Sequence, residues 1–334
     1  MEYGLIGEKL GHSYSKPIQE ALLENYTFEI HPLPKDEVDA FMTNKEFKAI
    51  NVTIPYKQTV IPYLDEMDEV ATKIGAVNTI VNHDGYLVGH NTDYYGFKYM
   101  VLHHHIHMEG KKVLIMGNGG ASQAIQAVVN DFHPKEVYIV DIILTDGILT
   151  IEEVYEKHSD VEIVVNTTPL GMYPNVDACS IDFDRLPCIE ACLDVVYNPY
   201  RTEFALQAKQ RGILSVTGLE MLVGQAKYAL EFFKDIQIDD ARIDPIYKQI
   251  LLETTNIVTY NEADAKTLAK AFSKELVKVD NDHLREASIH TNQVLWIEES
   301  DVNEHTLHEL ERNGFIVTSS EDVVSDFKAY LNAL

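Results

Sequence analysis

The chain has 334 residues, of which 27 are Lys or Arg and 53 are Asp or Glu, so its formal net charge is −26. This charge repels nucleic-acid phosphates and anionic membrane surfaces, so we expect neither as a partner. With 46% hydrophobic and 24% charged residues and no apolar run long enough for a membrane span, the composition is typical of a folded globular protein.

The N-terminus and the cysteines predict a cytoplasmic protein. The first residues lack the basic region and the apolar core of a secretory signal. The chain has only three cysteines, Cys179, Cys188 and Cys192. An odd and small number argues against a disulfide framework and favours a reducing compartment. They also lack a fourth nearby ligand for zinc, so we expect no metal there.

The first hundred residues alternate short strands and helices. Pro17 stands near the start of the first helix, where its missing N–H costs little. The hairpin turns at His83-Asp84-Gly85. The expected elements are, in order, a strand at 3–6, a helix from Ser15, a strand at 49–54, a hairpin of 76–82 and 86–89, and a helix at 92–102.

A second unit begins near Lys111 with an apolar strand at 112–116, and a glycine-rich turn follows it at once. Apolar residues then recur at helical spacing, and a further strand at 136–140 ends in Asp141. Strand, glycine turn, helix and strand are the opening of a doubly wound nucleotide-binding sheet. More strands are expected at 162–166 and 189–196, and an amphipathic helix at 218–233.

From about residue 251 a small appended α/β domain begins. We expect strands at 256–260, 276–279, 293–297 and 315–318, a helix at 261–273 capped by Asn261, and a last helix that carries apolar residues from Val323 to Leu334. This part carries no Gly-x-x-x-x-Gly-Lys motif. We therefore expect an interaction, regulatory or dimerising role for it.

Lys57 and Asp93 are the strongest candidates for a catalytic pair. Lys57 follows a strand that ends at Pro55, and Asp93 lies in the first turn of a helix. A carboxylate that faces the lysine across a pocket would keep the ammonium charged and oriented, so that it could stabilise a developing negative charge or exchange a proton. Taken singly, a solvated lysine at a sheet edge and an aspartate that pairs with a helix dipole explain the same residues.

A histidine run at 103–107 invites a metal hypothesis. Adjacent residues on a helix point in different directions, so they should not share one ion. His103 and His107 are spaced to share one, but a third ligand is not nearby in the sequence. We therefore expect a solvated helix end and no metal.

Seven blocks, in order along residues 1–245, resemble the shikimate/quinate dehydrogenase family. Any one block is weak, but seven in the same order are specific. The blocks are Gly11-His12-Ser13-Tyr14-Ser15, Asn51-Val52-Thr53-Ile54-Pro55-Tyr56-Lys57, Gly75-Ala76-Val77-Asn78-Thr79, Gly89-His90-Asn91-Thr92-Asp93, Gly117-Asn118-Gly119-Gly120-Ala121, Asn166-Thr167-Thr168-Pro169-Leu170-Gly171-Met172 and Gly218-Leu219-Glu220-Met221-Leu222-Val223-Gly224-Gln225.

The resemblance implies an α/β protein that reversibly reduces 3-dehydroshikimate to shikimate with a nicotinamide cofactor. It implies a substrate domain at 1–101 with a returning helix at 218–245 and a Rossmann-type NAD(P)-binding domain at 102–217. The appended α/β domain at 251–334 lies outside the resemblance and departs from the family pattern. The resemblance also implies Lys57 and Asp93 as the catalytic pair. The implied substrate contacts are Ser13, Ser15 and Tyr197 for the carboxylate, and Thr53, Asn78 and Gln225 for hydroxyls. The implied cofactor contacts are Gly117, Asn118, Gly119, Gly120 and Ala121 at the pyrophosphate, and Asn166, Thr167 and Met172 beside the nicotinamide.

The adenosine half of the cofactor site departs from the family pattern. NADP-using members carry an arginine after the second strand of this domain, whereas this chain has Asp141, which usually hydrogen-bonds a free ribose 2′-hydroxyl. The segment that follows has room for only one short helix at 150–158. NADP is the usual cofactor of the family, but these residues favour NAD. We expect both cofactors to bind weakly.

Two alternatives to a shikimate dehydrogenase remain open. One is an NAD-dependent quinate/shikimate dehydrogenase. The other is a non-catalytic shikimate-binding sensor with a degraded cofactor site, which the shortened segment favours and the intact Lys57 and Asp93 oppose. We expect a monomer or a homodimer.

Overall fold

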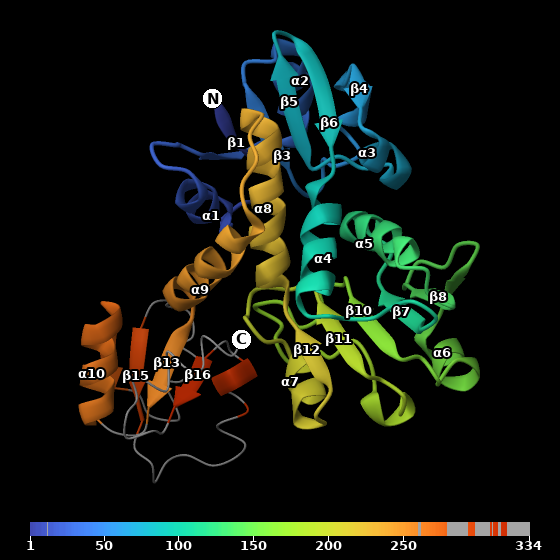
Figure 1. Ribbon diagram of the computed structural model, residues 1–334, viewed down its shortest axis with the longest axis vertical. Helices are drawn as coiled ribbons and strands as arrows, with labels where there is room; N and C mark the ends of the chain where they lie inside the picture. The colour runs from blue at the N-terminus through green and yellow to red at the C-terminus, as the bar shows by residue number, and fades with distance from the viewer. Residues whose placement is uncertain are drawn as a thin grey trace.

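The computed structural model describes residues 1–11, 13–259, 262–278, 293–297, 308, 310–312 and 315–318. Three separate sheets organise these residues, each with its own helices (Figure 1). Each expected strand within this part of the chain is present, with ends that differ by no more than three residues. No helix of the described residues is both long enough and apolar enough to cross a bilayer.

The first sheet is mixed, with strand order β2-β1-β3-β5-β6-β4. The predicted hairpin is confirmed, because β5 and β6 pair antiparallel around Asp84 and Gly85, which both adopt positive φ angles (52° and 98°). The elements of this unit are β1 (Tyr3–Gly7), α1 (Ser15–Leu22), β2 (Glu29–Pro32), α2 (Val38–Asn44), β3 (Ala49–Val52), β4 (Glu66–Met67), α3 (Glu69–Ile74), β5 (Thr79–His83) and β6 (Tyr86–His90).

The second sheet is parallel throughout, with order β12-β11-β10-β7-β8-β9, which is the Rossmann strand order. The segment after β8 is short, as predicted. Residues 141–147 join β8 to β9 without a helix, and α6 is the one short helix between β9 and β10. The elements are β7 (Lys112–Met116), α5 (Gly120–Asp131), β8 (Glu136–Val140), β9 (Ile148–Leu149), α6 (Ile151–Lys157), β10 (Ile163–Asn166), β11 (Ala191–Asp194), α7 (Glu203–Gln210) and β12 (Leu214–Val216).

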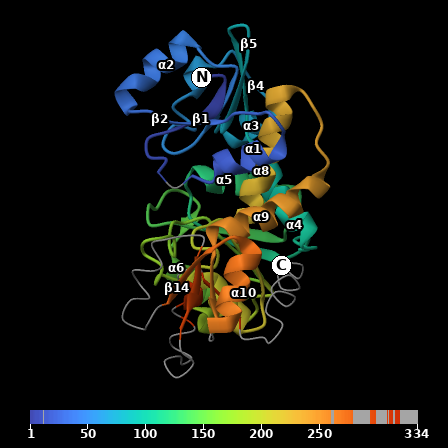
Figure 2. The same ribbon diagram turned by 90° about the vertical axis from the view of Figure 1, so that its left-hand side faces the viewer.

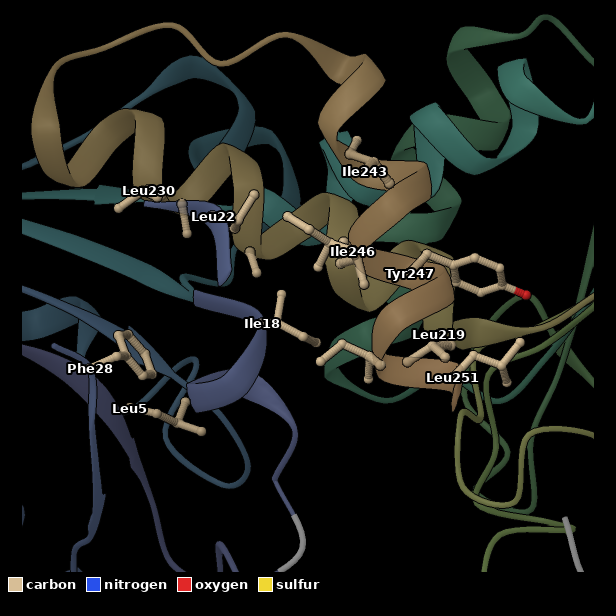
Figure 3. Packing of buried hydrophobic residues seen from close by; sticks show 14 of the residues in the cluster. Leu5, Ile18, Leu22, Phe28, Leu219, Leu230, Ile243, Ile246, Tyr247 and Leu251 are labelled. Carbon is tan, nitrogen blue, oxygen red and sulfur yellow. The ribbon is translucent and has the colours of Figure 1, made fainter. Parts of the chain in front are cut away.

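Two crossing helices connect these units: α4 (Thr92–His103) leads from the first sheet to the second, and α8 (Gly218–Lys234) leads back. Their backbones approach closely at glycines, because a Cβ built on Gly96 would lie 2.6 Å from the Met221 carbonyl oxygen. Helix α9 (Ile243–Thr254) then packs with α8 against α1, where Ile18, Leu219 and Ile246 meet (Figure 3).

The third sheet is also parallel, with order β14-β15-β13-β16. Its elements are β13 (Asn256–Thr259), α10 (Glu262–Phe272), β14 (Glu275–Lys278), β15 (Gln293–Trp296) and β16 (Phe315–Thr318), and they lie below α9 (Figures 1 and 2). Ile257, Leu268 and Val294 belong to the same buried cluster as α1, α8 and α9. The predicted Asn261 cap and the helix expected at 323–334 lie outside the described residues.

Candidate active site

Lys57 and Asp93 meet in a short ion pair. The Lys57 Nζ atom lies 2.5 Å from Asp93 Oδ2, and the two side chains are only 15% and 11% exposed. Lys57 follows the end of β3, and Asp93 lies in the first turn of α4, so two separate elements hold the pair. Because little water reaches it, the pair keeps an oriented ammonium with a fixed counter-charge, which suits a group that acts on a developing oxyanion.

Asn78 anchors a buried polar network beside this pair. Its side-chain oxygen accepts hydrogen bonds from the Thr92 amide at 2.7 Å and from the Thr79 hydroxyl at 3.0 Å. Asn51 donates to the Thr79 hydroxyl, and the Thr92 hydroxyl lies 3.5 Å from Gln225 Oε1. Asn78, which directly precedes β5, therefore satisfies the first amide of α4. These hydrogen bonds leave its side-chain nitrogen unused.

Ser13 and Ser15 form a local pair at the start of α1. The Ser13 hydroxyl donates to Ser15 Oγ at 3.1 Å and accepts the Ser15 amide at 3.2 Å. The intervening Tyr14 packs its ring 5.4 Å from that of Tyr197, so this segment and the loop after β11 lie side by side. Burial raises the pKa of the Tyr197 hydroxyl, which keeps it a neutral hydrogen-bond donor. The two serines and Tyr197 thus provide neutral hydrogen-bond donors from two adjacent segments.

Thr53 and Gly7 close the end of the first sheet. The Thr53 amide donates to the Ile6 carbonyl at 2.9 Å. A Cβ built on Gly7 would lie only 2.6 Å from the Thr53 methyl carbon, so a larger residue here would have to displace the Thr53 side chain. The close contact fixes Thr53 between β3 and the loop that carries Lys57.

The glycine turn after β7 brings the second sheet to the lysine. Gly117 has a φ of +99°, and Gly119 is the extended residue that precedes α5. A Cβ built on Gly120 would lie 3.9 Å from Lys57 Cδ, so the first turn of α5 borders the lysine stem. A helix N-terminus at the carboxyl edge of a parallel sheet fits a pyrophosphate, so the turn suits a dinucleotide.

Asp141 is turned toward this glycine loop. Its carboxylate accepts the Asn118 amide at 2.6 Å and the Ile143 amide at 2.9 Å, and these backbone hydrogen bonds lower its pKa. It is therefore a negative charge held beside the glycine turn. A carboxylate there accepts hydrogen bonds from ribose hydroxyls and repels a 2′-phosphate.

The loop after Asp141 exposes three successive aliphatic side chains. Ile142, Ile143 and Leu144 are 97%, 71% and 58% exposed. This loop takes the place of a crossover helix, and it leaves an apolar surface beside the glycine turn, which is uncommon for side chains of this size.

Asn166, Thr167 and Met172 differ in how accessible they are. Asn166 is fully buried and donates to Asp194 Oδ1 at 3.0 Å. The Thr167 hydroxyl donates to the Met116 carbonyl at 2.7 Å, which ties the loop to the glycine turn. Met172 is 46% exposed, so of the three its side chain is the most accessible to a ligand.

Two residues of the polar network escaped the sequence reasoning. Gln19 of α1 is fully buried and donates to Asn51 Oδ1 at 3.3 Å and to the Ala226 carbonyl at 3.1 Å. Thr92 lies at the centre of the network. Its place within the Gly89–Asp93 block could have marked it as a site residue. For Gln19, helical periodicity alone gave no signal, because its partners lie on distant elements.

This chain is similar to known proteins in sequence and in structure. The chain matches the family model described as the shikimate dehydrogenase substrate binding domain over residues 5–80. It is 37% identical to a shikimate dehydrogenase (NADP(+)) of Clostridium beijerinckii over 73% of this chain and 96% of that protein. It is 34% identical to the corresponding protein of Clostridium perfringens over 74% of this chain and 97% of that protein.

Solved structures give the same result. A chorismate mutase/shikimate 5-dehydrogenase fusion protein from Clostridium acetobutylicum matches with a TM-score of 0.69 and 34% identity, over 74% of this chain and 96% of that chain. A shikimate 5-dehydrogenase from Listeria monocytogenes, solved with shikimate and NAD, matches with a TM-score of 0.64 and 27% identity, over 75% and 96% of the two chains. About a quarter of this chain lies beyond these matches.

Proposed function

This chain belongs to the shikimate dehydrogenase family, and from that premise we propose that its Lys57–Asp93 pair catalyses the reversible reduction of 3-dehydroshikimate to shikimate. The chain is an oxidoreductase of the NAD(P)-dependent shikimate 5-dehydrogenase type. The observation that supports the catalytic assignment is the 2.5 Å contact between Lys57 Nζ and Asp93 Oδ2 beside the glycine turn.

Each member of the pair has a distinct role in this proposal. The nicotinamide supplies or accepts the hydride when it is bound. The Lys57 ammonium hydrogen-bonds the substrate oxygen that gains or loses charge, and it exchanges a proton with that oxygen. Asp93 orients the ammonium in a place that is largely shielded from water.

The neutral donors around the pair would hold the substrate. We assign Ser13, Ser15 and Tyr197 to the carboxylate, because the two serine hydroxyls are paired at the start of α1 and the Tyr197 ring packs on the intervening Tyr14. We assign Thr53, Asn78 and Gln225 to the ring hydroxyls. Buried polar partners of this kind reject an analogue that would leave them unpaired.

We assign the cofactor to the turn Gly117, Asn118, Gly119, Gly120 and Ala121, with Asn166, Thr167 and Met172 on the nicotinamide side. NAD should serve at least as well as NADP, because Asp141 faces the turn and residues 140–147 contain no Lys or Arg. Both should bind weakly, because residues 141–147 replace a helix that would wall the adenosine pocket.

The domain assignments follow the three sheets. Residues 1–101 with 218–245 would bind substrate, 102–217 would bind cofactor, and 251–334 would form an appended unit. The three free cysteines support a cytoplasmic location. A monomer or a homodimer is our expectation for the assembly.

The test of the activity is the absorbance of reduced nicotinamide when the purified chain meets shikimate with NAD or with NADP. Formation of reduced cofactor with shikimate and not with quinate supports the proposal. Equal rates with quinate would favour a quinate/shikimate dehydrogenase. Calorimetric binding of shikimate without reduction of either cofactor would favour the sensor.

Steady-state kinetics with both cofactors test the Asp141 assignment separately. A strong preference of kcat/KM for NADP would contradict it. A low-micromolar KM for either cofactor would contradict the expectation of a weakened adenosine pocket.

A further inference from the structure

We propose that His103, His104 and Glu220 form a binding site for a divalent transition-metal ion such as Zn²⁺, at the point where α4 meets α8. The site lies outside the machinery assigned above, and it joins two residues at the end of one helix to a residue in the first turn of another.

The three side chains already converge on one point. His103 Nδ1 lies 2.5 Å from Glu220 Oε1, and His104 Nε2 lies 2.8 Å from Glu220 Oε2. One potential ligand atom from each residue lies within 4.8 Å of the other two. Tetrahedral coordination by Zn²⁺ at its usual bond lengths separates donor atoms by about 3.3 Å, so small side-chain rotations suffice to admit an ion.

The end of helix α4 explains how two adjacent histidines reach the same carboxylate. Neighbours within a helix diverge, which is why we expected them not to share an ion. His103 is the last residue of α4, however, and His104 has already left helical geometry, with φ −86° and ψ 8°. The departure of the chain from the helix turns His104 back toward Glu220, and this corrects the expectation of a merely solvated helix end.

The chemistry of the donors suits a transition metal. Two imidazole nitrogens and one carboxylate are a common ligand set for Zn²⁺ and for other metals that prefer nitrogen, whereas Mg²⁺ and Ca²⁺ prefer all-oxygen sites. The Glu220 side chain is only 6% exposed, so its charge is shielded from water and gains from a cation. His104 and Glu220 also line a cavity of about 310 Å³, which has room for water to complete the coordination.

The position of the site predicts a mechanical effect. Helix α4 leads from the first sheet to the second and α8 leads back, so an ion bound to both would tie the two connections together. Binding to the folded state alone raises its stability by mass action. We therefore expect Zn²⁺ to raise the Tm of this chain.

The experiment uses the full chain without a histidine tag, stripped of metal by a chelator and titrated calorimetrically with ZnCl₂. The unsubstituted chain should bind one equivalent. His103→Ala and His104→Ala should each weaken binding by at least about tenfold, because each removes a direct ligand. Their Tm should no longer respond to Zn²⁺.

Exposed histidines of the same run provide the matched controls. His105→Ala and His107→Ala should bind Zn²⁺ as the unsubstituted chain does, because neither residue contacts Glu220 among the described residues. Glu220→Gln tests the carboxylate, and the two histidine variants decide the question if that variant fails to fold by circular dichroism.

Titration with Co²⁺ distinguishes this site from one that uses cysteine. Visible bands without a thiolate charge-transfer band are expected, and they should disappear in His104→Ala. The proposal is overturned if the unsubstituted chain binds no Zn²⁺, if His103→Ala and His104→Ala bind it as tightly, or if a thiolate band appears.

Discussion

The Lys57 ammonium should act on kcat far more than on binding. It lies beside the glycine turn and pairs with Asp93, and we propose that its charge stabilises the negative charge that develops during reduction. Interactions that strengthen only in the transition state appear in kcat. Lys57→Ala should reduce turnover by about 10²–10⁴-fold, the usual range for a general acid or base, while shikimate binding weakens less. Near-normal turnover would exclude this role.

Substitution of the two serines should change KM and leave kcat largely unchanged, the reverse of the effect expected for Lys57. Ser13→Ala and Ser15→Ala should mainly raise the KM for shikimate, because we assign these hydroxyls to a carboxylate that does not change during the reaction. Steady-state kinetics on both sides of the reaction separate the two effects. A change confined to kcat would remove these serines from the substrate site.

Asp194 should make stability depend on pH between about 4 and 6. It is fully buried, and burial raises its pKa from 3.8 to about 6 despite three hydrogen-bond donors. The folded protein therefore binds this proton more tightly than the unfolded chain. The stabilisation is complete below the unfolded pKa and is lost as the pH rises through about 6.

Chemical denaturation of Asp194→Asn and the unsubstituted chain at several pH values measures this contribution. From pH 4 to pH 7 the unsubstituted chain should lose on the order of 3 kcal/mol of its free energy of unfolding relative to Asp194→Asn, at about 1.4 kcal/mol for each pKa unit. A difference that stays constant over this range would contradict the raised pKa.

At the scale of elements, the crossing of α4 and α8 depends on the absence of a side chain at Gly96. An alanine Cβ there would lie 2.6 Å from the Met221 carbonyl and 2.8 Å from the Gln225 amide. Overpacking of this kind costs about 1–3 kcal/mol beyond the roughly 1 kcal/mol that alanine gains in a helix. Gly96→Ala should lower the free energy of unfolding and raise the KM for shikimate, because Gln225 must shift.

Gly11→Ala is a control for this prediction, since a Cβ at Gly11 would meet no atom within 4 Å. Its free energy of unfolding should change by no more than about 0.5 kcal/mol. Equal losses in the two variants would show that the helix crossing is not the cause.

Elements with strong apolar runs could be predicted from the sequence, and elements defined by their partners could not. Strands β7 and β8 have the predicted ends because they are short apolar segments bounded by turn residues. β9 has two residues and exists only through its pairing with β8, so no local pattern marks it. Helix α9 was missed because its apolar face continues the core of α8 and α1, and it lies between two segments that we treated as separate units.

The same limit applies to the site. Lys57 and Asp93 could be paired because each stands in a recognisable block. The contact of His104 with Glu220 joins residues 116 positions apart, and it depends on the way in which α4 ends. Periodicity gives no information about such a contact, because only the folded chain brings these two positions together.

At the scale of the whole molecule, one buried cluster joins the first unit to the third sheet. Leu22 of α1, Ile250 of α9 and Ile257 of β13 all belong to it. Ile250 is fully buried, so Ile250→Ala should cost about 2–5 kcal/mol of stability. Hydrogen exchange followed by mass spectrometry should become faster in both α1 and β13.

Ile142→Ala is the matched control, because Ile142 is 97% exposed and its loss should leave exchange unchanged. Faster exchange in β13 alone after Ile250→Ala would show that the third sheet unfolds independently.

The aliphatic side chains of Ile142, Ile143 and Leu144 lie in water beside the turn assigned to the cofactor. Water around such surface contributes heat capacity, and its release on binding makes the heat-capacity change negative. Calorimetry of NAD binding at several temperatures should therefore give a negative heat-capacity change, and the change should become smaller in Ile143→Ser. An equal heat-capacity change in both proteins would mean that the bound dinucleotide does not displace water from this surface. A smaller change in Ile143→Ser would mean that the loop which replaces a helix covers part of the dinucleotide with apolar side chains.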